Sequence, residues 1–320
     1  MTFAESVSHG AILLGAIIGV VTYLTWVERK FSGRLQSRIG PYLVGRPHGW
    51  LQPIADALKL LSKEDITPTK TDRFLFNLAP IWVVVMSLLG FAFLPLTINW
   101  VLVNIDLGLL YFSAIGSLIV IGVFIAGWAS NNKYALLSAL RAAAQIVAYE
   151  VPLLLSLLVP AVLAGSLNFQ DIILAQEKYW FILFPVVGQI SGITFLLAAL
   201  AEGNRIPFDL SEAESELVAG FNIEYSGMKF AYFYLGEYAH LLAVSILVSI
   251  LFLGGPLGPL LSGGVWIALK TLIVFLIVLW IRWSFLRLRI DQMMMLNWKV
   301  LVPLSLGNLL VAGLWVSLSR

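Results

Sequence analysis

The sequence predicts an all-α polytopic membrane protein with about eight transmembrane helices and an interfacial amphipathic helix in its first long connection. Hydrophobic residues make up 60% of the 320-residue chain and charged residues 12%, and the mean hydropathy is +0.92. Apolar stretches of about 20 residues, the length that a helix needs to cross a bilayer, recur along the whole chain. We therefore interpret residues 1–320 as a single transmembrane domain.

The apolar stretches give the expected spans. They lie at residues 9–27, 76–97, 107–129, 138–163, 180–201, 229–254, 264–283 and 299–318. The segment from Met1 to Ser8 contains no basic residue, so the first stretch is expected to be a span and not a cleaved signal peptide.

Basic residues concentrate in alternate connections and predict the orientation. Sixteen of the 20 lie in or beside the connections between spans 1–2, 3–4, 5–6 and 7–8, and the other loops contribute only Lys178. Basic residues close to span ends are enriched on the cytoplasmic side. Both termini are therefore expected on the non-cytoplasmic side, and these four connections in the cytoplasm.

The first connection, residues 28–75, contains an amphipathic pattern. Its apolar residues recur at helical spacing at Trp50, Leu51, Ile54, Leu58 and Leu61, while Asp56, Lys59 and Lys63 share the polar side. The pattern predicts a helix lying in the membrane interface. Such a helix is either a surface anchor or the floor of a cavity that a lipid-soluble molecule enters from the bilayer, and the sequence favours neither.

The fourth span carries two charged residues, Arg141 and Glu150. A separation of nine residues places them on opposite faces of a helix, so they do not pair with each other. Pro152 lacks an N–H and leaves the carbonyl of Ala148 without an intrahelical partner. Glu150 is either a group that exchanges protons or a structural residue hydrogen-bonded to a neighbouring helix.

Six of the 18 acidic residues lie between the fifth and sixth spans, at Glu202, Asp209, Glu212, Glu214, Glu216 and Glu224. Neighbouring carboxylates disfavour one another's ionisation and can then hold and pass protons near neutral pH. The alternative is a solvated acidic loop. Pro207 and Phe208 within the segment argue against that alternative.

The sixth and seventh spans carry isolated polar residues. Glu237 lies roughly 14 Å into the sixth span, near the membrane centre, on one face with Tyr234 and His240. An ionisable residue at that depth is a candidate functional group. We interpret His240 as a hydrogen-bonded packing residue in preference to a ligand, and Lys270 as a side chain that extends to the interface.

The chain contains no cysteine and three histidines, which excludes an iron–sulfur, haem or zinc site of its own. Electrons for any redox reaction must therefore arrive on a partner. The last connection gathers Arg282, Arg287, Arg289 and Asp291, which suit anionic lipid, an acidic partner or a polar headgroup. Nothing in the charge pattern indicates nucleic-acid binding.

Several motifs together resemble one family, the quinone-proximal membrane subunit of respiratory complex I (the H subunit of NADH-quinone oxidoreductase). The motifs are Glu28-Arg29-Lys30, Arg38–Pro41, Leu51–Asp56, Lys63–Asp65, Ser130–Tyr134, Arg141–Gln145, Tyr149-Glu150, the stretch Glu202–Gly227 and Asp291–Met293. The resemblance covers essentially the whole chain. The sequence departs from the family pattern at Gly45–Gly49, which carries one extra residue, and at Leu286 and Ile290.

The resemblance implies a subunit without a complete active site of its own, in the plasma (inner) membrane of a bacterium. Quinone is the implied substrate, and FMN and iron–sulfur clusters are implied in hydrophilic partner subunits. The implied quinone-binding residues are Arg29, Arg34, Arg38, Asp56 and Arg287. The implied proton-coupling residues are Glu150, Glu202, Asp209, Glu212, Glu214, Glu216, Glu224 and Glu237.

Two alternatives stay open beside this interpretation. One is the homologous subunit of a membrane-bound hydrogenase or ferredoxin-linked complex, which need not bind quinone. The other is a free-standing secondary transporter, although such folds commonly contain internal repeats and none is recognisable in this chain. The sequence also leaves open the type of quinone and the electron donor of the whole complex.

Overall fold

The computed structural model describes residues 3–97, 100–210, 220–259 and 261–319. In chain order its helices are α1 (Phe3–Leu35), α2 (Gln52–Ser62), α3 (Arg73–Leu89), η1 (Gly90–Ala92), α4 (Gly108–Ser117), α5 (Ile119–Ala129), α6 (Lys133–Ala164), α7 (Phe169–Ala175), η2 (Phe181–Leu183), α8 (Val187–Glu202), η3 (Gly220–Asn222), α10 (Gly227–Phe252), α11 (Gly263–Ser284), α12 (Ile290–Leu296), η4 (Asn297–Leu301) and α13 (Val302–Ser319). Of these, η4 is a π-helical turn that joins α12 to α13 without a break.

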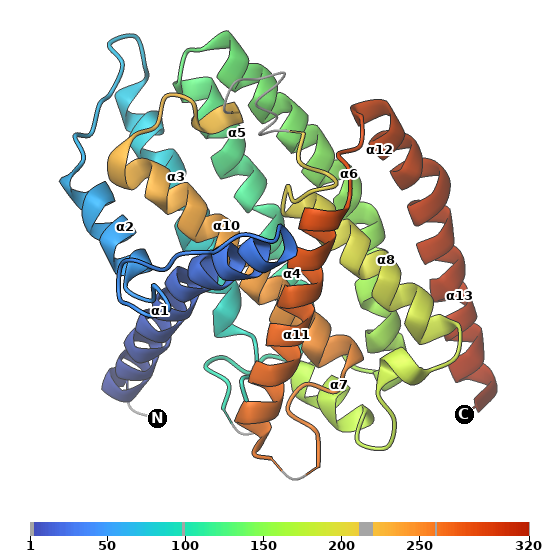
Figure 1. Cartoon of the computed structure of the whole chain (residues 1–320). Helices are drawn as coiled ribbons and strands as arrows, with labels where there is room; N and C mark the ends of the chain where they lie inside the picture. Colours follow the sequence, from blue (N-terminus) through green and yellow to red (C-terminus); the bar gives the residue numbers. More distant parts are fainter. Residues whose placement is uncertain (1–2, 98–99, 211–219, 260, 320) are drawn as a thin grey trace.

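The helices confirm the predicted all-α polytopic membrane fold. Within the described residues, seven helical stretches are long and apolar enough to cross a membrane, and α8 is a shorter apolar helix beside them. The chain passes up and down through the bundle, and both termini lie at the same end (Figure 1). The connections 63–72, 130–132, 203–210, 220–226 and 285–289 lie at the opposite end, which we call the charged end.

Several predicted spans differ from the helices of the structure, and the differences in the third, fifth and eighth spans are the most informative. The fifth span was expected from residue 180, but α8 starts only at Val187, because Pro185 follows the short turn η2 and has no N–H to donate. The third span is split at Leu118, whose carbonyl accepts a hydrogen bond from Trp82 Nε1 at 2.9 Å. The eighth span begins at Ile290 and not at residue 299.

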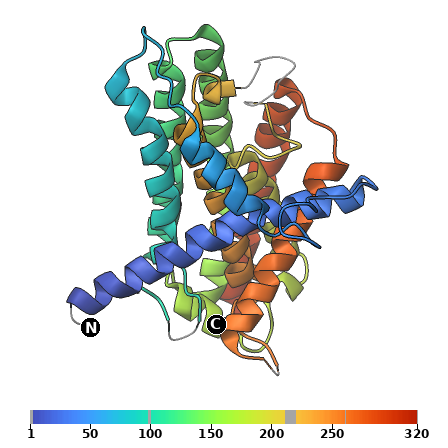
Figure 2. The same cartoon turned by 60° about the vertical axis from the view of Figure 1, so that its left-hand side comes forward.

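The first two helices lie obliquely on the bundle. Figure 2 shows that α1 crosses the other helices at a steep angle, which accommodates its 33 residues. The predicted amphipathic helix is confirmed as α2. Its apolar residues Ile54, Leu58 and Leu61, and the preceding Trp50 and Leu51, are 45% to 62% exposed, so this segment offers an apolar side to a lipid surface.

The helix α10 lies at the centre of the molecule. It is 78% buried along its most apolar stretch, more than any other candidate span in the described residues, and it packs against α3, α11 and α1. Glu237 and His240 lie on this helix, so their side chains face protein on most sides.

Two further polar residues in the spans bind backbone carbonyls. The carbonyl of Ala148, which Pro152 leaves without an intrahelical partner as predicted, accepts a hydrogen bond of 2.7 Å from Asn297 Nδ2 in η4. The interpretation that Lys270 extends to the interface is wrong. Its ammonium is buried and donates to the carbonyls of Leu253, Gly255 and Leu257 at 2.6, 2.9 and 2.7 Å, which fixes the C-terminal end of α10.

Candidate functional site

A cluster of charged side chains is buried between α1, α10 and α11, near the charged end. Glu28 of α1 accepts a hydrogen bond of 2.6 Å from the Tyr238 phenol and a close, charged one from the Arg282 guanidinium. Its Oε2 also lies 4.0 Å from Nη1 of Arg205. One buried carboxylate therefore balances two guanidinium groups from different segments of the chain.

Arg205 joins this cluster to the carboxylate of the sixth predicted span. Its side chain is only 3% exposed, and its Nε lies 3.0 Å from Glu237 Oε1. The guanidinium also lies over the ring of Tyr238, at 4.6 Å from the ring centroid. Glu237 is therefore an ion-paired group within the protein, and Arg205 links it to Glu28.

The segment that follows α8 is held tightly against the helices. Gln145 Nε2 on α6 donates to the carbonyls of Ala201 and Phe208, both at 2.7 Å. The backbone N–H of Leu288 donates to the carbonyl of Pro207 at 2.9 Å. The alternative of a solvated acidic loop is therefore wrong for residues 201–210, where Glu202 and Asp209 are largely buried.

Asp209 and Arg287 form an ion pair across two connections. The distance from Arg287 Nη2 to Asp209 Oδ2 is 3.3 Å, and the Arg287 side chain is 35% exposed whereas Asp209 is mostly buried. The pair joins connection 285–289 to the segment 203–210 at the charged end, and the guanidinium stays partly open to a partner or ligand.

Two small cavities follow the buried carboxylates deeper into the bundle. The first, of about 50 Å³, is lined by Glu202, Glu237 and His240 together with Asn204 and Asn222. The second, of about 20 Å³, is lined by Glu150, Glu202 and His240 among apolar side chains. Since a cavity needs roughly 10–15 Å³ to hold one water, both are large enough for water-assisted contact between these groups.

Glu150 is held at the far wall of the second cavity. Ser117, the last residue of α4, donates a short hydrogen bond to its Oε1. Glu202 is the last residue of α8, and its Oε2 lies 3.8 Å from His240 Nε2. The structure thus brings together Glu150, Glu202 and Glu237, three of the predicted proton-coupling residues, with His240 between them.

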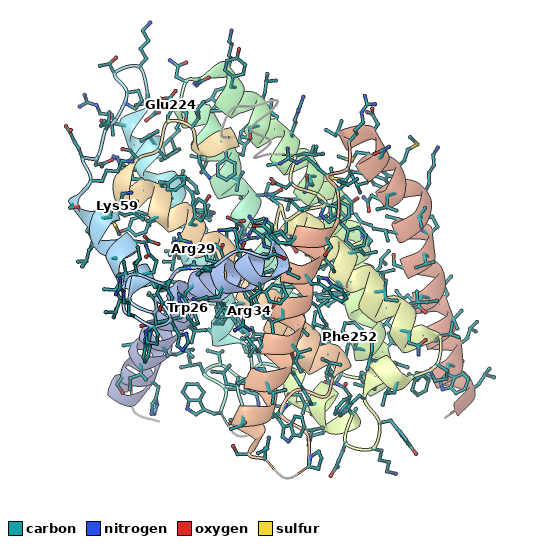
Figure 3. All side chains as sticks on the ribbon, viewed as in Figure 1. Trp26, Arg29, Arg34, Lys59, Glu224 and Phe252 are labelled. Carbon is teal, nitrogen blue, oxygen red and sulfur yellow. The ribbon has the colours of Figure 1, made fainter. Side chains whose placement is uncertain are left out.

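The predicted quinone-binding residues of the first connection lie on the α1–α2 side (Figure 3). Arg29 Nη1 is 2.5 Å from Asp56 Oδ2, and Gln52 Nε2 donates to the other oxygen of Asp56 at 2.9 Å. Arg34 and Arg38 are exposed, and the Arg38 Nε donates to Gln36 at 2.7 Å. Arg29 therefore joins α1 to α2, whereas Arg287 pairs with Asp209.

Glu224 lies apart from the other predicted acids that the structure describes. It accepts a hydrogen bond of 2.7 Å from Asn132 Nδ2 and borders a polar groove that also contains Lys70 and Lys133. Figure 3 shows it at the charged end, away from Arg29 and Arg34. The next residue, Tyr225, stacks on the ring of Phe76, and burial raises the pKa of its phenol above the ordinary value.

The three remaining predicted acids, Glu212, Glu214 and Glu216, lie outside the described residues. Arg289 and Asp291 are described and are exposed at the start of α12. In the part of the chain that the structure describes, no group of three or more His, Asp and Glu side chains could hold a metal ion.

Three residues of the buried charge cluster, Glu28, Arg205 and Tyr238, were given no site role from the sequence. Glu28 stands in a run of charges at the end of an apolar stretch, where an interfacial side chain is the ordinary expectation. A weak signal exists, since Tyr238 directly follows Glu237 and Arg205 is the one cation inside the acidic segment. Their contact joins residues up to 210 positions apart, which local patterns do not reveal.

Comparison with known proteins identifies the family. The chain matches the model of the NADH dehydrogenase family over residues 9–313. It belongs to this family. Among its relatives, the NADH-quinone oxidoreductase H subunit of Dehalococcoides mccartyi (strain ATCC BAA-2266 / KCTC 15142 / 195) is 50% identical over 94% of this chain and 84% of its own length.

Two further relatives are matched over a larger share of their own length. The NADH-quinone oxidoreductase H subunit of Geobacillus kaustophilus (strain HTA426) is 50% identical, over 95% of this chain and 92% of the relative. The second NADH-quinone oxidoreductase H subunit of Syntrophobacter fumaroxidans (strain DSM 10017 / MPOB) is 48% identical, over 98% and 96%. This family member is therefore an integral membrane subunit of an oxidoreductase complex, as the resemblance implied.

Proposed function

We propose that this chain forms the membrane side of the quinone-reduction chamber of NADH-quinone oxidoreductase and couples quinone reduction to the protonation of buried carboxylates. The observation that carries the proposal is a set of ionisable side chains between the charged end and Glu150. Arg287 pairs with Asp209, and Arg205 pairs with both Glu28 and Glu237. Glu237, Glu202, His240 and Glu150 then line the two cavities.

The chain's own residues support both ends of this coupling. At the charged end, the partly exposed guanidinium of Arg287 is suited to orient a polar headgroup. The Arg29–Asp56 pair ties α1 to α2, the helix whose exposed apolar side suits contact with a lipid-soluble quinone. Reduction of quinone to quinol takes up electrons and protons. We infer that the electrons arrive from FMN and iron–sulfur clusters in hydrophilic subunits that dock at the charged end.

Inside the protein, a change of charge in the chamber acts on a balanced ion network. Arg205 is shared between Glu28 and Glu237, so a new charge near Asp209 and Arg287 alters which carboxylate it compensates. Loss of that compensation favours uptake of a proton by the carboxylate, since an unpaired buried charge is costly. The proton then has a route through the two cavities to Glu202 and Glu150.

The same proposal includes the orientation of the chain in the membrane. The charged end faces the cytoplasm of a bacterium, both termini face the opposite side, and the bilayer surrounds the apolar helices. Relatives named NADH-quinone oxidoreductase favour this assignment over a hydrogenase-type complex.

The test replaces Glu150 and Glu202 singly by Gln in the assembled complex in its own membranes. Because Gln keeps the shape but does not titrate, each variant should lower quinone reduction and the proton gradient together, by up to about 10²-fold where proton transfer limits the rate. NADH oxidation by ferricyanide should persist. Asp171→Asn is the matched control, an exposed carboxylate at the end opposite to the charged end. Unaltered rates and gradients in both Glu variants would refute the coupling role.

A further inference from the structure

The two cavities of the candidate site are separate, and two ionisable side chains line both of them. The cavity of about 50 Å³ contacts Glu237, and the cavity of about 20 Å³ contacts Glu150. Glu202 and His240 are the ionisable residues lining both. Any proton that moves between Glu237 and Glu150 by this route must therefore pass the boundary that Glu202 and His240 form.

The imidazole of His240 lies at this boundary, and its Nε2 makes no hydrogen bond to the described residues. Its side chain is 13% exposed, and its Nε2 lies 3.8 Å from Glu202 Oε2, beyond hydrogen-bond distance. A buried polar atom without a hydrogen-bond partner lowers the stability of the fold. Packing alone therefore does not explain why a histidine occupies this position.

An imidazole has the chemistry that this position requires. One ring nitrogen accepts a proton while the other releases one, so the ring passes a proton from one side to the other. The second cavity has room for about one water by the same volume criterion. Ser113 and Ser117, together with apolar residues such as Leu153 and Phe195, complete its lining, so Glu202 and His240 are the titratable groups that face Glu150 there.

The groups around the ring come from several helices. Glu202 faces it from α8 and Glu150 from α6 across the second cavity, Ser117 lies at the end of α4, and Glu237 is one turn away on α10 itself. The Arg205 guanidinium, which is bound to Glu237, repels a permanently charged imidazolium. A neutral ring that faces carboxylates on two sides is suited to transient proton transfer.

We propose that His240 is the proton-transfer bridge between Glu202 and Glu150. The proton leaves the Glu202 carboxyl for one ring nitrogen, and the proton on the other nitrogen leaves through the second cavity for Glu150. The net change is one proton lost by Glu202 and one gained by Glu150, and the ring returns to its starting state by tautomer exchange. This assignment rests on the proposed coupling function, and it makes His240 a specific step within it.

The test is His240→Gln in the assembled complex, compared with Ser245→Ala. Gln keeps a polar, uncharged side chain, and Ser245 is a buried residue of the same helix that lines neither cavity. We expect His240→Gln to assemble normally and to lose proton translocation and quinone reduction by about tenfold or more, as expected for loss of a proton-transfer group. Ser245→Ala should retain the parent rates.

The pH profile separates proton transfer from a structural role. Without the imidazole, transfer across the boundary depends on hydronium, so the residual rate of His240→Gln should rise as pH is lowered more steeply than in the parent. A uniformly low rate with the parent pH profile would show a structural role and overturn the proposal. Failure of both His240→Gln and His240→Asn to assemble, while Ser245→Ala assembles, would overturn it as well.

The remaining outcomes distinguish this inference from the function on which it rests. Parent-like activity and pH profile in His240→Gln, combined with losses in Glu150→Gln and Glu202→Gln, would overturn the His240 bridge and leave the carboxylate route in place. Parent-like activity in all three variants would overturn the coupling function and the bridge together.

Discussion

Glu28 is a single carboxylate placed between two guanidinium groups, those of Arg205 and Arg282. Its replacement by Gln would leave Arg205 buried with Glu237 as its remaining ion-pair partner in the cluster. Because breaking a buried ion pair from one side leaves an uncompensated charge, Glu28→Gln should destabilise the subunit by about 3–5 kcal/mol. The measurement is the temperature at which the subunit is released from the purified complex.

The control for Glu28 is an ion pair at the surface. Asp65 pairs with Lys229 at 2.9 Å, but the Asp65 side chain is 51% exposed. Exposed pairs contribute about 0–1 kcal/mol, so Asp65→Asn should shift the release temperature little. Equal shifts for the two variants would show that Glu28 contributes no more than a surface charge.

At the level of single residues, the buried carboxylates could be predicted from the sequence, whereas the side chains that contact them could not. Glu150 and Glu237 could be predicted because an ionisable residue in an apolar span is conspicuous by itself. Glu202 could be predicted because it belongs to the dense acidic segment after the fifth span. Glu28 and Tyr238 could not, since their importance comes from contacts between helices far apart in sequence. Lys270 shows the same limit, because its three carbonyl acceptors belong to the turn after α10.

The contact between α6 and the helical stretch formed by α12 and η4 is the contact between elements that mutation can test most directly. Pro152 frees the carbonyl of Ala148, and Asn297 of η4 supplies the missing hydrogen bond at 2.7 Å. Tyr149 adds a second hydrogen bond to the same contact, because its phenol donates to the carbonyl of Met293 at 2.8 Å. These bonds hold the stretch that carries Glu150 against α12.

Asn297→Leu should therefore destabilise the subunit by about 1–3 kcal/mol, because the buried carbonyl of Ala148 is left without a partner. In a Pro152→Ala background, the restored N–H of residue 152 can satisfy that carbonyl, so the same replacement should cost less. A double-mutant cycle on the release temperature gives the difference. An equal cost of Asn297→Leu in both backgrounds would contradict the compensation of Pro152 by Asn297.

The elements were largely predictable, and the failures have a common cause. Hydropathy and length depend on neighbouring residues, so the central spans and the amphipathic helix α2 follow from the sequence. The eighth span was predicted from residue 299, although the helical stretch begins at Ile290 and includes the polar Asn297. Asn297 is in fact buried, with its polarity satisfied by another helix, which a count of apolar residues does not anticipate.

The whole molecule distributes its ionisable groups unevenly along the bundle. Asp209 and Arg287 pair at the charged end, and Glu150 lies at the second cavity deeper in the bundle. In the described lining of that cavity, the residues beside Glu150, Glu202 and His240 are uncharged, among them Ser117, Leu154 and Leu157. This uneven distribution fits the proposed role of a subunit that exchanges protons within a complex.

The orientation of the molecule follows from the same asymmetry and can be measured. Sixteen of the 20 basic residues lie in or beside the connections between predicted spans 1–2, 3–4, 5–6 and 7–8, and both termini lie at the end opposite to the charged end (Figure 1). Because basic residues flanking spans are retained in the cytoplasm, alkaline phosphatase fused to the C-terminus should be active and a fluorescent protein fused there should be dark. Fusions placed after Asn132, in a charged-end connection, should give the reverse pattern and serve as the internal control. A fluorescent C-terminal fusion with an inactive phosphatase fusion would place the termini in the cytoplasm. The charged end would then face the other side of the membrane, which would contradict the proposed cytoplasmic side of the quinone chamber.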